Sequence, residues 1–150
     1  MRSFTIKPVT VIALGALIGV VAPLATRVTA RPVYNAIMTY QYELRDDKDL
    51  RGTCQYCHTD PEGGDLWNPF GTLMREVFFE EAGRLVPETL YLTLKRDQDS
   101  DKDGYKDVLE VIGKSFPGDP KSKPAKSVAE LEKQLADMGG LDAFQPKVGR

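Results

Sequence analysis

Histidine and cysteine are scarce in this chain of 150 residues, which has one histidine and two cysteines. Structural zinc is therefore disfavoured, because it needs four ligands and usually a second Cys/His pair. The sequence also has no internal repeat, no phosphate-binding glycine loop and no Ser/His/Asp arrangement. The sequence motifs therefore do not indicate a serine hydrolase or a nucleotide-binding enzyme.

Basic residues are not in excess either. The chain has 20 Lys and Arg against 22 Asp and Glu. Residues 1–30 carry three of the basic residues and no acidic one, so the remainder has 17 basic against 22 acidic groups, a net charge of −5. We expect no nucleic-acid partner, since such binding needs a basic footprint. The length allows one domain, or one domain plus an appendage.

The scarce residues lie together in Cys54-Gln55-Tyr56-Cys57-His58. C-x-x-C-H is the attachment signature for c-type haem. Two thiols at this spacing can each bond one vinyl group, and the adjacent imidazole then lies under the iron. A redox dithiol remains an alternative, although it normally follows a strand in a βαβ pattern that we do not find. Zinc is a further alternative that lacks a fourth ligand.

This segment resembles the haem site of monohaem c-type cytochromes. The resemblance implies haem c bonded to Cys54 and Cys57, with His58 as the proximal iron ligand. It also implies export, because such haem is attached outside the cytoplasm in bacteria. Residues 59–64 and 68–71 are reminiscent of small exported bacterial cytochrome-like proteins.

The distal iron ligand is expected to be a methionine, since a thioether commonly lies opposite the histidine and raises the potential. Bis-histidine ligation is excluded by the single histidine. Met74 is favoured because it follows the haem loop, on a helix that starts with a sharp turn. Met38, Met138, another ligand or an open site remain alternatives, and most buried methionines are only packing.

Residues 1–30 are predicted to be a signal peptide or an uncleaved membrane anchor. Arg2 and Lys7 precede an almost wholly apolar run at 9–25, and a small-residue cleavage site follows. The run is about 17 residues long, the lower limit for a spanning helix. We expect a periplasmic or otherwise extracytoplasmic protein, with membrane association through residues 8–26 if the segment is retained.

The fold is predicted to be all-α, with a helical haem-binding region at residues 31–96. Apolar spacing predicts helices over 32–50 and 87–96. Asn68-Pro69 is an N-cap followed by proline at the first helical position, and Gly83 is the expected stop. The helix predicted over 32–50 leads into the cysteine motif, as a helix typically does in small c-type cytochromes.

Residues 97–120 are predicted to bind calcium. Numbered from Asp99, carboxylates occupy positions 1, 3, 5, 9 and 12 of a twelve-residue loop, with glycine at position 6. This spacing is typical of an EF-hand, in which position 7 supplies a carbonyl and position 12 two oxygens. The expected ligands are Asp99, Asp101, Asp103, Tyr105, Asp107 and Glu110.

The alternative is a solvated acidic loop, although charges this close repel one another without a cation. The single loop, with the Pro117-Gly118-Asp119-Pro120 stretch after it, resembles bacterial loops related to thrombospondin type 3 repeats. In those loops the calcium is structural.

Residues 121–150 are predicted to form a linker, a C-terminal helix and a tail. A capping box at Ser127 opens the helix. The tail at 141–150 is expected to be irregular.

These features predict one-electron transfer by haem c outside the cytoplasm, with redox proteins as partners and no enzymatic activity. The alternative is a haem-bearing accessory or structural subunit of a membrane electron-transfer complex. A small haem enzyme or gas sensor with an open sixth position is least favoured, because no distal acid–base group is evident.

Overall fold

The computed structural model describes residues 32–147 and is all-helical over them, as predicted, with no named strand in that range. The elements are α1 (Pro32–Gln41), α2 (Pro69–Glu80), α3 (Val86–Lys95), α4 (Asp107–Gly113), α5 (Val128–Asp137) and the 3-10 helix η1 (Gly140–Phe144). The predicted signal or anchor at 1–30 lies outside the described residues. Between residues 32 and 147, no helix combines the length and apolarity needed to cross a membrane.

Two helix starts follow the capping chemistry in the sequence. The Asn68 side chain accepts a hydrogen bond from the Gly71 amide, and Pro69 follows as the first helical residue. At α5, the Ser127 hydroxyl and the Glu130 carboxylate form the predicted capping box. Each cap satisfies amides that have no partner within the helix, which is why these boundaries were predictable.

The helix predicted over 32–50 is wrong beyond Gln41. The chain turns at Glu43, where φ is 56°, and Leu44 and Leu50 are then buried in the core. The Lys114 ammonium donates hydrogen bonds to the carbonyls of Tyr42 and Glu43, just after the end of α1, although it lies 72 and 71 positions away in sequence. The helix therefore ends early because burial of Leu44 and Leu50, and the hydrogen bonds from Lys114, favour a turn over the helix that the apolar spacing predicts.

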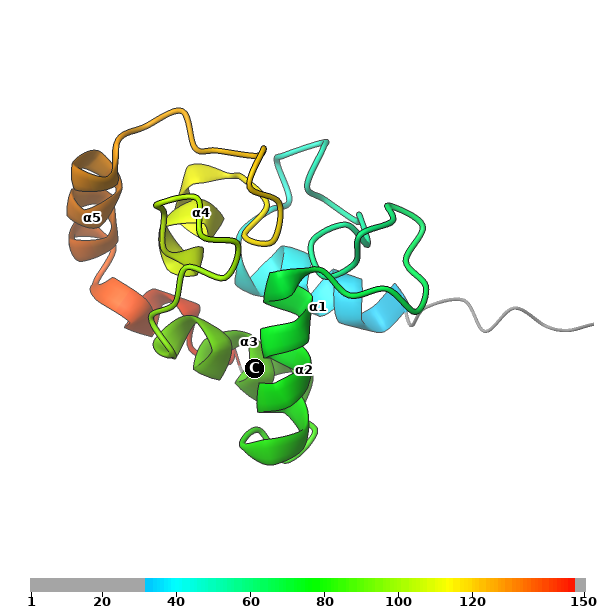
Figure 1. Cartoon of the computed structure of the whole chain (residues 1–150). Helices are drawn as coiled ribbons and strands as arrows, with labels where there is room; N and C mark the ends of the chain where they lie inside the picture. Colours follow the sequence, from blue (N-terminus) through cyan, green and yellow to red (C-terminus); the bar gives the residue numbers. More distant parts are fainter. Residues whose placement is uncertain (1–31, 148–150) are drawn as a thin grey trace, which may run out of the picture.

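The helices share one main core, and their arrangement is drawn in Figure 1. Helix α3 lies against both α1 and α2, α4 packs on α5, and η1 contacts α3 and α5. One cluster of buried side chains runs from Met38 in α1 to Phe144 in η1. The predicted calcium loop and the C-terminal helix thus pack onto the same core as the cysteine motif.

The irregular tail predicted at 141–150 is wrong for its first part, where η1 forms. Phe144 is 2% exposed, and its ring lies edge-on to Tyr42 with centroids 6.0 Å apart. The side-chain Nε2 of Gln41 donates hydrogen bonds to the carbonyls of Phe144 and Pro87. One buried aromatic ring therefore orders a segment without regular apolar spacing.

Candidate functional site

A cavity of about 880 Å³ lies beside the cysteine motif. Its walls come from α1, α2, the start of α3 and loop residues, which are Arg45, 51–54, 57–58 and Trp67. Cys54, Cys57, His58 and Met74 all line it, so four residues singled out in the sequence meet at one place. A volume of this size is in the range of small-molecule and cofactor sites.

The motif itself is a tight turn. The amides of Cys57 and His58 both donate to the Cys54 carbonyl, at 3.1 and 2.9 Å. The Asn35 side chain in α1 donates to the Thr53 carbonyl, at 3.1 Å, just before the first cysteine. The two thiols are therefore held on one short, hydrogen-bonded segment at the cavity wall.

Helix α2 is fixed directly on this turn. The Asn68 amide donates to the Cys57 carbonyl, and its side chain donates to the carbonyls of Gln55 and Tyr56, at 2.9 and 3.2 Å. A Cβ atom on Gly71 would lie 1.9 Å from the Cys57 carbonyl oxygen. Only glycine lets the helix approach this closely.

His58 packs against Trp67, with ring centroids 4.2 Å apart, and the two residues form an isolated β-bridge. Its Nδ1 atom is buried and has no hydrogen-bond partner among the described residues. A buried ring nitrogen without a partner is costly in a purely structural histidine. It fits a residue whose imidazole binds a metal ion.

The methionines divide into two groups. Met74 and Met38 are buried and line the cavity, whereas Met138 is 37% exposed and does not line it. The Cys57 thiol lies 3.5 Å from the Met74 sulfur. Two thioethers, on α1 and α2, are thus available to a cofactor in the cavity.

The two alternatives to haem find less support. Among residues 32–147, the two cysteines and His58 do not converge as a group of metal-ligand atoms. Burial, followed by the nearby Cys54, raises the pKa of Cys57 to about 12. Reactive dithiols have lowered pKa values instead. Zinc and redox-dithiol chemistry therefore fit the geometry less well than a covalent cofactor does.

Sequence reasoning missed the charge at the cavity. Arg45, Arg51 and Arg75 line it, and no Asp or Glu does among the described residues. Arg45 lies over the ring of Tyr40, and Arg75 over that of Trp67. Three cations beside an acid-free cavity suit a ligand with anionic substituents. Arg75 is 24 positions from Arg51 and 30 from Arg45, so only the fold brings it to the same cavity as the other two.

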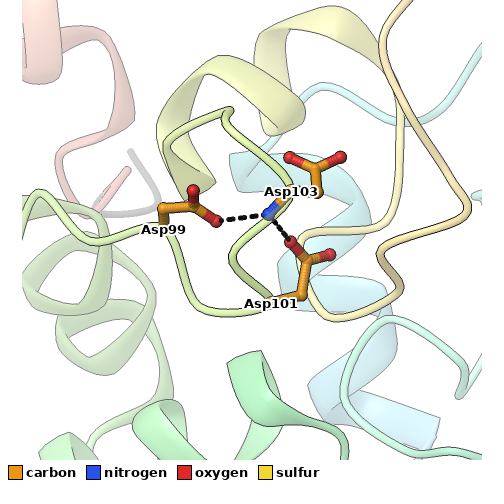
Figure 2. A group of neighbouring side chains, drawn as sticks. All are labelled: Asp99, Asp101 and Asp103. Atoms are coloured by element: carbon orange, nitrogen blue, oxygen red, sulfur yellow. Dashed lines mark hydrogen bonds between the residues drawn. The ribbon is translucent and has the colours of Figure 1, made fainter.

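In the predicted calcium loop, Asp99, Asp101 and Asp103 offer carboxylate oxygens within 4.8 Å of one another. Figure 2 shows the Asp103 amide donating to both other carboxylates, at 3.2 and 3.1 Å. The Asp99 carboxylate also accepts from the amides of Lys102 and Gly104. Backbone donors thus hold the first three acidic positions in a curled loop.

Several carboxylate oxygens in this loop lack a hydrogen-bond donor. One oxygen each of Asp101, Asp103 and Glu110 is buried without a hydrogen-bond partner among the described residues. Glu110 is fully buried, and the Asp103 side chain is 1% exposed. The Lys123 ammonium lies 3.6 Å from this Asp103 oxygen, which is an ion-pair distance. Buried carboxylate oxygens without a hydrogen-bond donor at three loop positions, one of them beside a lysine, fit a site for a cation.

The charges in the loop oppose one another. Burial, and then repulsion from Asp103, raises the pKa of Asp101 to about 6. Burial, and then the Asp101 charge, raises the pKa of Glu110 to about 9. Both shifts disfavour the anionic forms that would bind a cation, and a divalent ion would reverse them.

Two predicted ligands differ from the rest. Both Asp107 oxygens accept hydrogen bonds from Ser100, one from its amide and one from its hydroxyl, at 2.8 and 2.7 Å. Asp107 therefore braces the loop, while burial raises its pKa to about 7. The Tyr105 amide donates to Asp103, which places this residue within the loop's turn.

Comparison of the chain with protein-family models, curated proteins and solved structures finds no match. The residues and their geometry are therefore the basis for a functional proposal.

Proposed function

We propose that this protein carries one covalent haem c and transfers single electrons outside the cytoplasm. The supporting observation is the cavity of about 880 Å³ with Cys54, Cys57 and His58 on its wall and Met74 beside them. The haem would supply an iron that cycles between Fe(III) and Fe(II). Among the described residues that line the cavity there is no Asp or Glu, and this favours a carrier over an enzyme that needs a carboxylate for acid–base chemistry.

The residues would divide the work as follows. Cys54 and Cys57 would hold the ring, and His58, whose imidazole packs against Trp67, would bind the iron. Met74 is the proposed second ligand to the iron, and Met38, which also lines the cavity, is the alternative. Arg45, Arg51 and Arg75 provide positive charge at the cavity. A largely apolar wall excludes water, which is one of the protein's means of tuning the potential.

We further propose that residues 99–110 bind a structural calcium ion. Asp99, Asp101, Asp103 and Glu110 would contribute carboxylate oxygens, and Tyr105 its carbonyl. The buried oxygens without donors support this proposal over a solvated acidic loop. Asp107 is assigned to the outer shell, because Ser100 occupies both of its oxygens.

The test of the haem proposal is covalent attachment. The protein should be expressed in a host competent for cytochrome c assembly, with its N-terminal segment intact. A denaturing gel stained for haem should then show the wild type, and Cys54→Ala with Cys57→Ala should lose the stain. Intact mass would report the haem and cleavage of residues 1–30 together. An unstained wild type would falsify the proposal.

The redox partner is proposed to be another protein, either soluble or part of a membrane electron-transfer complex. Fractionation of the expressing cells distinguishes these cases. A haem stain in the membrane fraction would favour the accessory-subunit alternative, and a stain in the soluble extracytoplasmic fraction would favour a diffusing carrier.

A further inference from the structure

The segment after the calcium loop contacts the residue that clamps the cysteine motif. Asn68 is buried and makes contacts on several sides. Its side-chain oxygen caps α2, its side-chain nitrogen donates to Gln55 and Tyr56, and its amide donates to Cys57. Any movement of Asn68 would therefore disturb the backbone between the two cysteines.

Gly118 lies directly against the Asn68 side chain. A Cβ atom on Gly118 would lie 2.4 Å from Cγ of Asn68. Because three hydrogen bonds hold the Asn68 side chain, it cannot move aside without breaking one of them. Gly118 and Asn68 are thus two parts of one close contact between segments 50 residues apart in sequence.

The same segment is fastened to the calcium loop. The Ser115 hydroxyl donates to one oxygen of Glu110, the last residue of the loop, at 3.1 Å. The Phe116 ring lies 5.8 Å from that of Tyr56, inside the cysteine motif. Further on, the Lys123 ammonium donates to the Asp103 carbonyl, at 2.6 Å. Figure 2 shows this segment passing beside Asp101 and Asp103.

A second pair of buried groups lies along this path. The Tyr56 hydroxyl and one Glu110 oxygen are both buried without a hydrogen-bond partner among the described residues. Tyr56 belongs to the motif and Glu110 to the loop, and the Glu110 charge acts on the Tyr56 hydroxyl by raising its pKa, after the larger effect of burial.

We propose that Asn68 is a positioning residue through which the cation in loop 99–110 holds the cysteine motif in place, so that the two sites are thermodynamically linked. This inference rests on the proposed haem and calcium functions. With calcium bound, Glu110 and segment 115–118 are fixed, and Gly118 holds Asn68 against the motif. Linkage is reciprocal, so ordering the motif around its cofactor also strengthens calcium binding.

The experiment measures amide hydrogen exchange in residues 54–68 of the haem-loaded protein, with chelator and with millimolar calcium. Haem staining and a calcium titration come first. Calcium should slow exchange across the motif by about fivefold or more, the lower end of typical coupling between sites. The slowing should disappear in Gly118→Ala, which retains every proposed ligand to haem and calcium.

Two further variants separate positioning from simple structure. Asn68→Ser keeps a helix cap but removes the donors to Gln55 and Tyr56, so the effect of calcium on the motif should be lost although α2 remains. Gly113→Ala is the matched control, since its Cβ atom would meet Pro124 rather than Asn68. It should retain the effect.

The reciprocal measurement uses the haem-free variant Cys54→Ala with Cys57→Ala, which should bind calcium more weakly than the haem-loaded wild type. Equal exchange with and without calcium would overturn the linkage while leaving both proposed ligands in place. A wild-type response in Asn68→Ser would reduce Asn68 to a helix cap. Absence of haem or calcium in the preliminary assays would instead overturn the proposed function itself.

Discussion

The cavity beside the cysteine motif and the acidic loop at residues 99–110 differ in which of their groups lack a partner. Around the cavity the polar backbone is well paired, through Asn68 and the Cys54 carbonyl, but a volume of about 880 Å³ is lined mostly by apolar groups. In the loop the packing is tight, but buried carboxylate oxygens lack donors. If the cavity holds haem, losing it should expose apolar side chains to water. If the loop holds calcium, losing it should leave buried carboxylates without a compensating charge.

The comparison predicts that haem matters most to stability. Cys54→Ala with Cys57→Ala should lower the thermal midpoint by ten degrees or more, because the core around Met38 and Leu90 then loses its packing partner. For a chain of 150 residues, each kcal/mol shifts the midpoint by about 2–4 °C. Circular dichroism melts of both proteins with calcium present would measure this. A matched midpoint would mean that the cavity closes on itself.

Calcium should have the next largest effect. Extracellular sites bind at about 10⁻⁴ to 10⁻³ M, so millimolar calcium should stabilise the wild type by up to about 1.4 kcal/mol. We expect calcium to raise the midpoint by several degrees over chelator, and to do much less for Glu110→Gln. Lys133→Gln, on the exposed face of α5, serves as the surface control. Equal wild-type midpoints in both buffers would reduce the motif to an acidic loop.

The loop also predicts how stability depends on pH. In the ion-free protein, burial raises the pKa of Asp101 to about 6, of Asp107 to about 7 and of Glu110 to about 9. Between their ordinary values near 4 and these raised values, the folded state binds more protons than the unfolded state. Stability should therefore fall as pH rises from about 4 to about 9.

Calcium should reverse this dependence, because it binds the carboxylates and is itself bound better as they lose protons. Chemical denaturation at several pH values, with chelator or calcium, would measure both slopes. An ion-free protein that gains stability from pH 5 to 8 would contradict the assignment of these groups as the dominant titrating ones.

The smallest effect on stability should come from exchanging the methionines. Met74→Leu nearly preserves volume and should cost less than about 1.5 kcal/mol, yet it removes a thioether. If Met74 is the distal ligand, the oxidised protein should lose the weak sulfur-to-iron band at the red end of its visible spectrum. Met38→Leu and Met138→Leu should keep that band. Loss in Met38→Leu alone would move the ligand to α1.

Short-range features were determined by the sequence alone. The Cys54–His58 motif, the twelve-residue acidic loop and the caps at Asn68 and Ser127 depend on atoms a few positions apart. Local hydrogen bonds and the reach of side chains set such patterns, so spacing predicted them. The helix over 87–96 was predicted to within one residue of α3 at each end.

The long-range features were decided by the tertiary structure. Met38 and Met74 meet at one cavity, Gly118 rests on Asn68, and Phe144 orders the segment predicted to be irregular. Nothing in the sequence near each residue marks these contacts, because side chains far apart in the chain meet only when the helices pack. The chain's local chemistry therefore defined what each site could bind, and packing of the core decided which residues surround it.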